Sequence, residues 1–291
     1  MIKGSYVALV TPFNNNSVDY NALEKLIEFQ IANGTDGILL LGTTAESPTL
    51  AQDEKERIVR YSIRIIDGRV PVMVGTGSNN LNHTIAMTHR AEKWGADSAL
   101  IITPYYNKPT QNGLYHYFAQ IAKNVDIPIV IYNVPGRTGV NIDSSTTTKL
   151  ANGFDNIVAI KEASGNIVQV SEIVRDTSKE FSVMSGEDAL NMPILMAGAK
   201  GFISVTANIL PKELHSLYIA CEKGDKKELE KLHLYLVEIN KKLFIETNPI
   251  PVKYALSQMG KINNDVRLPL FEMDKDNKKN LVKTMKKYKL I

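Results

Sequence analysis

The sequence predicts an α/β protein built as a (β/α)8 barrel, the TIM-barrel architecture, with a C-terminal helical appendage. Eight short apolar segments rich in β-branched residues recur along the chain, each bounded by Gly, Pro or Asn. Helical patterns of apolar residues fill the gaps between these segments, and only helical patterns follow residue 209. About eight strand-and-helix units match a closed barrel in number and length. A doubly wound open sheet is the competing arrangement.

The expected strands read as buried on both faces, because their apolar residues do not alternate with polar ones. They cover residues 6–10, 37–41, 70–74, 99–102, 129–132, 157–160, 181–184 and 201–205.

The helices between them carry start and stop signals. Asp19 is placed to cap a helix that ends at Asn33-Gly34. Thr49 and Gln52 form the pattern of a capping box for the next helix. A later stripe of Leu114, Phe118 and Ile121 predicts another buried helix face.

The C-terminal part repeats leucine and isoleucine at helical spacing between residues 214 and 243, and a last helix is expected over residues 277–290. These helices extend well beyond what the last barrel unit needs. We therefore expect a catalytic barrel domain over residues 1–225 and a helical region over residues 226–291.

The composition is that of an ordinary globular protein. The 291 residues are 44% hydrophobic and 22% charged, which excludes disorder and coiled-coil classes. A net charge of +3 is too small to predict nucleic-acid binding, and a single cysteine excludes an internal disulfide framework. No targeting segment or membrane span is apparent, so a cytoplasmic location is expected.

Polar side chains follow the expected strands. In (β/α)8-barrel enzymes the active site lies at this end of the barrel, where the strands end. Lys161 is the most informative, because it comes directly after a buried strand. It could form a structural ion pair, although adjacent strand residues point to opposite faces, which argues against Glu162 as its partner. Alternatively it is a nucleophile, since desolvation lowers a lysine pKa and exposes the neutral amine that attacks carbonyls.

Four more residues could serve such chemistry, and each has a structural alternative. Tyr132 could move protons at the end of the neighbouring strand, yet tyrosines are common core residues. Arg137 in its Pro-Gly-Arg-Thr-Gly turn could bind a carboxylate or form a loop salt bridge. Thr43 and Thr44 precede a helix, where they could bind a carboxylate or cap the helix.

We find no sequence motif for a metal site or for a cofactor-binding site. Gly75-Thr76-Gly77 lacks the third glycine of a dinucleotide fingerprint, because Asn80 stands there. No Walker loop is present, and the five histidines show no ligand spacing. We expect neither a metal nor a cofactor.

Five motifs together resemble the dihydrodipicolinate synthases, a branch of the pyruvate-dependent Schiff-base lyases and aldolases, over essentially the whole chain. They are Gly-Thr-Thr-Ala-Glu-Ser (42–47), Thr-Pro-Tyr-Tyr-Asn-Lys-Pro (103–109), Tyr-Asn-Val-Pro-Gly-Arg-Thr-Gly (132–139), Ile-Lys-Glu-Ala-Ser-Gly (160–165) and Asn-Pro-Ile-Pro-Val-Lys (248–253).

The resemblance implies condensation of pyruvate, as an imine on Lys161, with L-aspartate 4-semialdehyde, in diaminopimelate and lysine biosynthesis. Tyr132 would move protons together with Thr43 and with Tyr106, which in the family reaches in from a neighbouring subunit. Thr44 would hold the pyruvate carboxylate and Arg137 that of the semialdehyde. The backbone at Gly186 and Ile203 would line the pyruvate pocket. Family members are commonly homotetramers built from two tight dimers.

Two departures from the family pattern stand out. Ala45 replaces the usual second glycine of the Gly-Thr-Thr motif, which the backbone tolerates only without a positive φ. At the lysine-feedback site, the family's polar residues match Ser47, Asn79 and Tyr105, but Gln52 and Lys55 replace histidines and His83 replaces a glutamate. We therefore expect lysine to inhibit only weakly.

Two other functions stay open at this point. A related class I aldolase, of the N-acetylneuraminate or 2-keto-3-deoxy-gluconate type, would have less use for a guanidinium at position 137. A catalytically silent regulatory barrel would have no need of Lys161, Tyr132, Thr43 and Tyr106 together.

Overall fold

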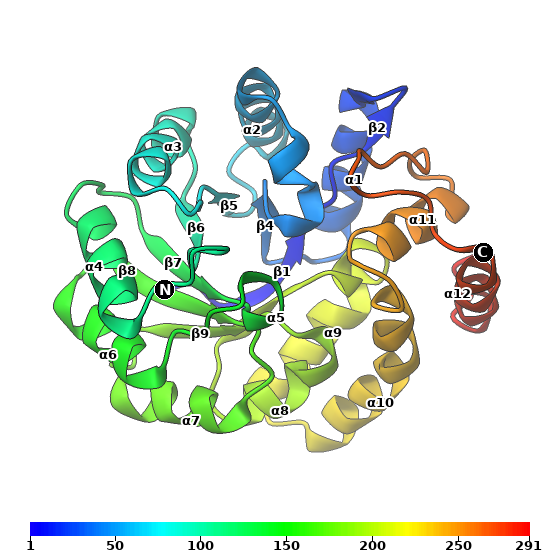
Figure 1. Cartoon of the computed structure of the whole chain (residues 1–291). Coiled ribbons are helices and arrows are strands. Elements are labelled where there is room, and N and C mark those ends of the chain that lie inside the picture. The colour runs from blue at the N-terminus through cyan, green and yellow to red at the C-terminus, as the bar shows by residue number, and fades with distance from the viewer. The chain divides into compact units, whose positions relative to one another are not determined.

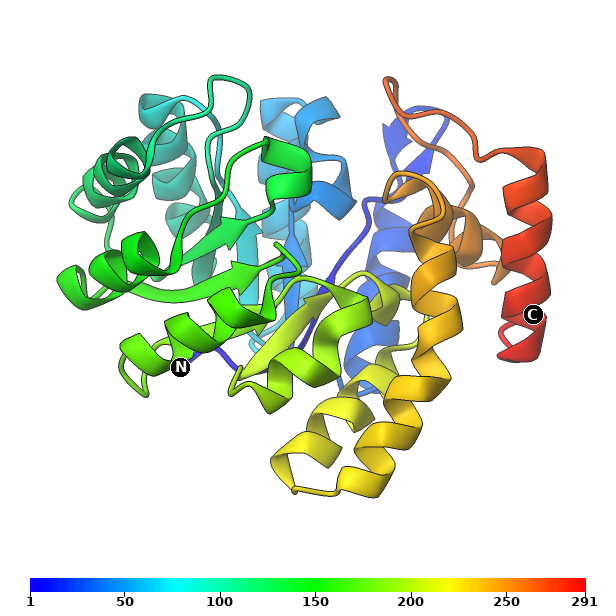
Figure 2. The same ribbon diagram turned by 60° about the horizontal axis from the view of Figure 1, so that its bottom comes forward.

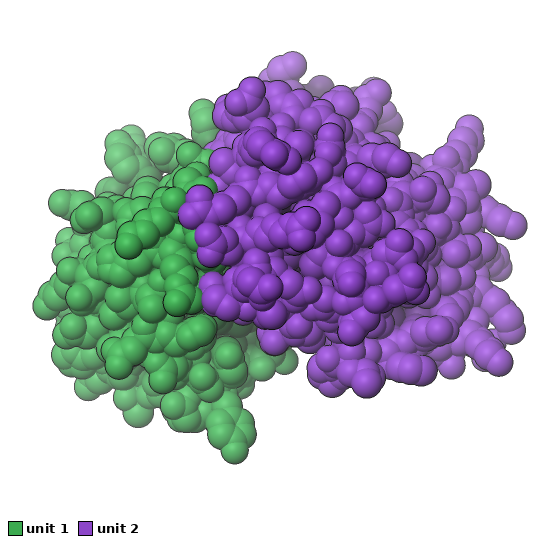
Figure 3. All heavy atoms as spheres, turned by 90° about the horizontal axis from the view of Figure 1, so that it is seen from above, with its two compact units in different colours: residues 1–4, 72–203 green, residues 5–71, 204–291 purple.

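The computed structural model describes residues 1–291 and confirms the predicted fold class. Eight parallel strands form a closed barrel in the order β1-β10-β9-β8-β7-β6-β5-β4, with helices between them, and further helices follow at the C-terminus (Figure 1). The chain forms two compact units, coloured separately in Figure 3. The first consists of Met1–Gly4 and Val72–Ile203, and the second of Ser5–Pro71 and Ser204–Ile291. A domain boundary after residue 225 stays a prediction.

The first unit carries most of the barrel strands and the helices between them. Its strands are β5 (Val72–Gly75), β6 (Ser98–Ile102), β7 (Ile129–Asn133), β8 (Ile157–Glu162), β9 (Ser182–Ser185) and β10 (Gly201–Ser204), whose last residue lies in the second unit. Its helices are α3 (Leu81–Trp94), α4 (Gln111–Ala122), α5 (Pro135–Thr138), α6 (Ser144–Gly153), α7 (Ile167–Asp176), the 3-10 helix η3 (Asp188–Leu190) and α8 (Asn191–Met196). The predicted stripe of α4 is confirmed, because Leu114, Phe118 and Ile121 are all fully buried.

The second unit combines the start and the end of the chain. Its strands are β1 (Gly4–Ala8), whose first residue lies in the first unit, β2 (Phe13–Asn14), β3 (Ser17–Val18) and β4 (Gly37–Leu40). Its helices are α1 (Tyr20–Ala32), η1 (Thr43–Ala45), η2 (Ser47–Thr49), α2 (Gln52–Ile66), η4 (Thr206–Asn208), α9 (Pro211–Glu222), α10 (Lys226–Leu243), α11 (Ile250–Gln258) and α12 (Lys275–Lys287). Helix α10 packs against both α9 and α12 (Figure 2).

The helix starts show one confirmed cap and one error. The Asp19 side chain accepts a hydrogen bond from the Ala22 amide, 3.0 Å away, as expected for the cap of α1. The Thr49–Gln52 capping box is wrong, because Thr49 ends η2 and its hydroxyl donates back to the Glu46 carbonyl at 3.0 Å. Helix α2 begins at Gln52, and Glu54 instead accepts a hydrogen bond from the Ala51 amide at 2.9 Å.

The small hairpin of β2 and β3 has no counterpart in the sequence predictions, since its strands are too short for a periodic pattern. Among the helices, none has both the length and the apolar character needed for a membrane span.

Candidate active site

Lys161 is the penultimate residue of strand β8 and is 6% exposed. Its register partner on β7 is Tyr132, so both side chains point to the same face of the sheet. The Lys161 Nζ atom lies 4.5 Å from the centre of the Tyr132 ring. The structure thus brings together two of the residues predicted to carry the chemistry.

Gly186 packs directly against the Lys161 side chain. A Cβ atom at position 186 would lie 2.9 Å from Lys161 Cε and 2.9 Å from the Ala163 Cβ. The Gly186 amide also donates a hydrogen bond to the Glu162 carbonyl at 2.8 Å, which holds the end of β9 against β8. Only glycine allows this approach, so position 186 shapes the space around the amine.

The environment of Lys161 shifts its protonation balance toward the neutral amine. Burial lowers the pKa of Lys161 to about 8, with Arg137 acting in the same direction and Asp188 and Glu187 opposing it. Compared with a pKa of 10.5, this raises the neutral fraction at pH 7 roughly 300-fold. A buried lysine of this kind is suited to attack a carbonyl carbon.

Glu162 is not the partner of Lys161, as the alternation along the strand predicted. Its carboxylate accepts hydrogen bonds from Asn133 Nδ2 at 3.1 Å to each oxygen, from Gln169 Nε2 at 2.8 Å and from the Ser164 amide at 2.8 Å. Four donor contacts satisfy this buried carboxylate without a cation. Lys161 takes part in none of the salt bridges of the structure, which argues against the structural ion-pair explanation.

Arg137 lies on α5, a single turn that starts with Pro135 and ends at Gly139 in the left-handed conformation. The Thr138 hydroxyl donates to the Val140 carbonyl at 2.9 Å and accepts from the Val140 amide at 3.2 Å, so the turn is internally braced. Arg137 itself is exposed, yet its charge acts on Lys161. Arg137 therefore stands on a braced turn, from which its positive charge lowers the pKa of Lys161.

The remaining predicted residues of the first unit lie on strand ends and loops. Ile203 is buried in β10. Tyr106 is 89% exposed and has a φ of 74°, so the loop after β6 turns this ring outward into solvent. Of the candidate lysine-site residues, the Asn79 amide donates to the Tyr105 carbonyl at 3.3 Å, and His83 is exposed near the start of α3.

Thr43 and Thr44 belong to the second unit, where they form η1 together with Ala45, directly after β4. Thr44 is buried, and its hydroxyl oxygen accepts a hydrogen bond from Asn248 Nδ2 at 2.9 Å. Ala45 is not among the positive-φ residues, so its methyl group is tolerated. Glu46, the next residue, takes the left-handed conformation instead, with a φ of 55°.

The second unit also holds the other candidate lysine-site residues. Ser47 starts η2, while Gln52 and Lys55 lie in the first turn of α2. Partial burial lowers the pKa of Lys55.

Two features of the site were not predicted from sequence. Glu187 and Asp188, directly after Gly186, are the acidic groups that act on Lys161. Asn248, Lys253 and Arg267 contact the Thr43–Glu46 loop from more than 200 residues away in the chain. The motif at residues 248–253 marked this segment as a candidate in the sequence. Its residues alone do not show that Asn248 contacts Thr44 or that Lys253 contacts Glu46.

Comparison with known proteins places this geometry in a family. The model of the dihydrodipicolinate synthetase family matches residues 1–288. The chain belongs to this family. It is 50% identical over 291 residues, the full length of both chains, to the 4-hydroxy-tetrahydrodipicolinate synthase of Thermodesulfovibrio yellowstonii.

Solved structures of the family agree closely with the fold. The crystal structure of dihydrodipicolinate synthase from Aquifex aeolicus superimposes with a TM-score of 0.97 at 48% identity, covering 99% of each chain. That of the Thermotoga maritima enzyme gives a TM-score of 0.99 at 42% identity, covering 100% of both chains. The prediction of a Schiff-base-forming lyase of the dihydrodipicolinate synthase family, rather than a sugar-acid aldolase, is confirmed.

Proposed function

We propose that Lys161 of this chain forms an imine with pyruvate and that the enzyme then condenses it with L-aspartate 4-semialdehyde. The single observation that supports this most is the buried, pKa-lowered Lys161 amine against Tyr132, at the end of a barrel strand. Attack of the neutral amine on the pyruvate ketone releases water and leaves an imine. Loss of a methyl proton converts the imine to an enamine, whose carbon attacks the aldehyde.

The other residues take the roles that the family pattern implies. Tyr132 moves protons in a relay with Thr43 and with Tyr106 of a neighbouring subunit. Thr44 donates to the pyruvate carboxylate, and Arg137 binds that of the semialdehyde as a bidentate ligand. Gly186 and Ile203 line the pyruvate pocket with their backbone. The amino group of the semialdehyde then displaces the lysine amine and closes the ring.

We also propose that the chain self-associates, as a homotetramer built from two dimers, in the cytoplasm. The exposed ring of Tyr106 supports this, because an aromatic side chain held out on a turn is suited to a subunit interface. Lysine should inhibit weakly, since Lys55 and His83 offer a lysine ammonium no anionic partner.

Borohydride trapping tests the assignment of Lys161. Reduction in the presence of pyruvate should add a stable mass to the peptide that contains Lys161, and Lys161→Arg should abolish it. Lys200→Arg, at a lysine just before β10, serves as the matched control and should label like the wild type. Labelling of another lysine, or none in the wild type, would contradict the proposal. A coupled assay with pyruvate and L-aspartate 4-semialdehyde tests the second substrate.

A further inference from the structure

The loop that carries Thr43 and Thr44 is held from the C-terminal part of the chain. After η1, Glu46 adopts a left-handed conformation that a residue with a side chain rarely takes. Such a conformation costs free energy and persists only where surrounding contacts fix it. The contacts of Glu46 and Thr44 therefore decide where the two threonines lie.

Glu46 forms a buried ion pair with Lys253 of α11. The Lys253 Nζ lies 2.6 Å from Glu46 Oε1, and the two side chains are 0% and 1% exposed. The second carboxylate oxygen, Oε2, accepts a hydrogen bond from the backbone amide of Arg267 at 2.9 Å. Both oxygens of Glu46 are thus bound by groups that lie more than 200 residues further along the chain.

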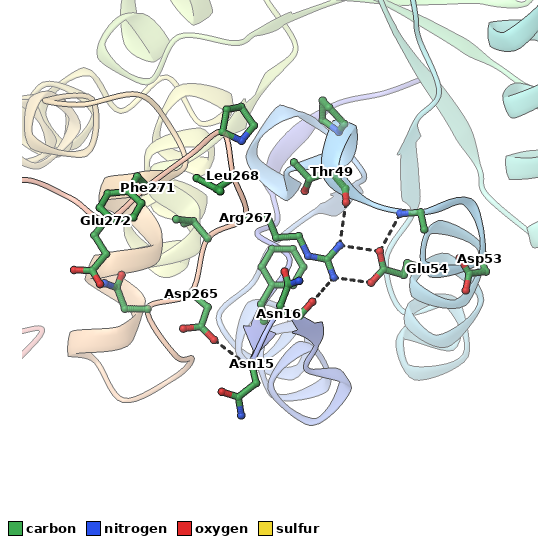
Figure 4. A pocket seen from close by; sticks show the side chains of 16 residues that line it. Asn15, Asn16, Thr49, Asp53, Glu54, Asp265, Arg267, Leu268, Phe271 and Glu272 are labelled. Atoms are coloured by element: carbon green, nitrogen blue, oxygen red, sulfur yellow. Dashed lines mark hydrogen bonds and ion pairs between the residues drawn. The ribbon is translucent and has the colours of Figure 1, made fainter.

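The residues around the Glu46–Lys253 ion pair keep it in place. The Phe13 ring is fully buried, with Lys253 Nζ 4.1 Å and Arg267 Cζ 4.3 Å from its centre. The Arg267 guanidinium in turn binds both carboxylate oxygens of Glu54, at 2.8 and 2.6 Å, and forms a wall of the open pocket in Figure 4. Two cations and two carboxylates therefore fix the loop between β4 and α2 to the C-terminal segment.

Asn248 acts on Thr44 itself. Its amide donates to the Thr44 hydroxyl oxygen at 2.9 Å and so occupies one acceptor position of that oxygen. The hydroxyl hydrogen then has to point elsewhere. A threonine in this state is a donor, which is the role that a bound carboxylate requires.

We propose that Asn248 and Lys253 are positioning residues for pyruvate binding: Asn248 orients the Thr44 hydroxyl as a donor, and Lys253 fixes the Thr43–Glu46 loop through Glu46. The inference rests on the proposed function, in which Thr44 holds the pyruvate carboxylate. Neither residue contacts the reacting atoms in this scheme. Their loss should therefore weaken pyruvate binding rather than slow the chemistry at saturating pyruvate.

The test is the pyruvate concentration that gives half-maximal borohydride trapping, measured together with KM for pyruvate and kcat. Asn248→Asp keeps the shape but replaces the donor by an acceptor, which turns the Thr44 hydroxyl away from the substrate. We expect the half-saturating concentration and KM to rise about tenfold or more, with kcat within about threefold. Lys253→Met should raise both concentrations in the same way. Irreversibly inactive protein lowers the amount of trapped imine without changing the half-saturating concentration. The measurement is made under conditions in which circular dichroism shows each variant to be folded, because a reversibly unfolded fraction would weaken the apparent affinity.

Asn240→Asp is the control, because Asn240 is also a buried asparagine in the second unit, but its Oδ1 accepts a hydrogen bond from the Thr206 hydroxyl at 2.8 Å and Asp keeps that acceptor. It should leave pyruvate half-saturation unchanged. If Asn248→Asp or Lys253→Met stays within about twofold of the wild type, the positioning role of that residue is wrong. Absence of trapping in the wild type would instead contradict the proposed function itself.

Discussion

At the scale of single residues, the charge balance around Lys161 determines at which pH the amine can react. Arg137 lowers the pKa of Lys161, whereas Asp188 raises it, and burial is the largest influence. The neutral amine is the nucleophile, so the rate of imine formation should follow its fraction. These two neighbours therefore offer opposite perturbations of one measurable quantity.

At low pyruvate concentration, the rate of imine formation should rise about tenfold per pH unit below about pH 8 and level off above it. Asp188→Asn removes a carboxylate that stabilises the ammonium form, so the midpoint should move to lower pH. Arg137→Ala removes a cation that destabilises the ammonium form, so the midpoint should move to higher pH. Both midpoints are measured by mixing enzyme rapidly with pyruvate at pH values from 6 to about 10 and reducing the imine with borohydride after short reaction times. Shifts in the same direction, or none, would show that these charges do not act on Lys161.

At the scale of elements, the end of β8 is held in place by Glu162, which points away from Lys161. Asn133 lies opposite Glu162 in the register of β7 and β8, and Gln169 reaches it from α7. The carboxylate thus ties two strands and one helix together at the strand end that carries Lys161. Because every contact to it comes from a donor, only an acceptor fits at this position.

Glu162→Gln should lower the free energy of unfolding by about 2–3 kcal/mol, since an amide NH2 would then face the donors of Asn133, Gln169 or Ser164. Glu172→Gln is the control, because Glu172 accepts one hydrogen bond from the Ser144 hydroxyl and is partly exposed. That change should cost less than about 1 kcal/mol. Urea unfolding measures both. Equal losses would mean that the donor cage does not stabilise β8.

At the scale of the whole molecule, the sequence predicted what depends on neighbouring residues. The eight strands are continuous apolar runs, and each lies within two residues of its expected start. Lys161 and Tyr132 were found because both stand at the end of such a run. Glu46 with Lys253, and Asn248 with Thr44, were not found, because their contacts join residues 207 and 204 positions apart. Thr49 does not cap α2, because Glu46 takes the left-handed conformation and stands at the N-cap of the separate 3-10 helix η2. No residue pattern in the sequence predicts this left-handed conformation.

The proposed subunit exchange of Tyr106 makes a prediction about the assembled enzyme. Lys161→Ala removes the nucleophile and keeps Tyr106. Tyr106→Ala removes the tyrosine and keeps Lys161. Each variant alone should be nearly inactive. If Tyr106 serves the neighbouring subunit, a mixed dimer contains one complete site, made of Lys161 from one chain and Tyr106 from the other.

Refolding the two variants together at equal concentration should therefore restore about a quarter of the wild-type activity, since about half of the dimers are mixed and half of their sites are complete. Mixing without refolding controls for slow exchange, and Tyr106→Phe reports whether the hydroxyl or only the ring is needed. If Tyr106 served its own subunit, no mixed dimer would hold a complete site, because each chain would lack one of the two groups. Activity would then stay at the level of the separate variants, and the exposed ring would need another explanation.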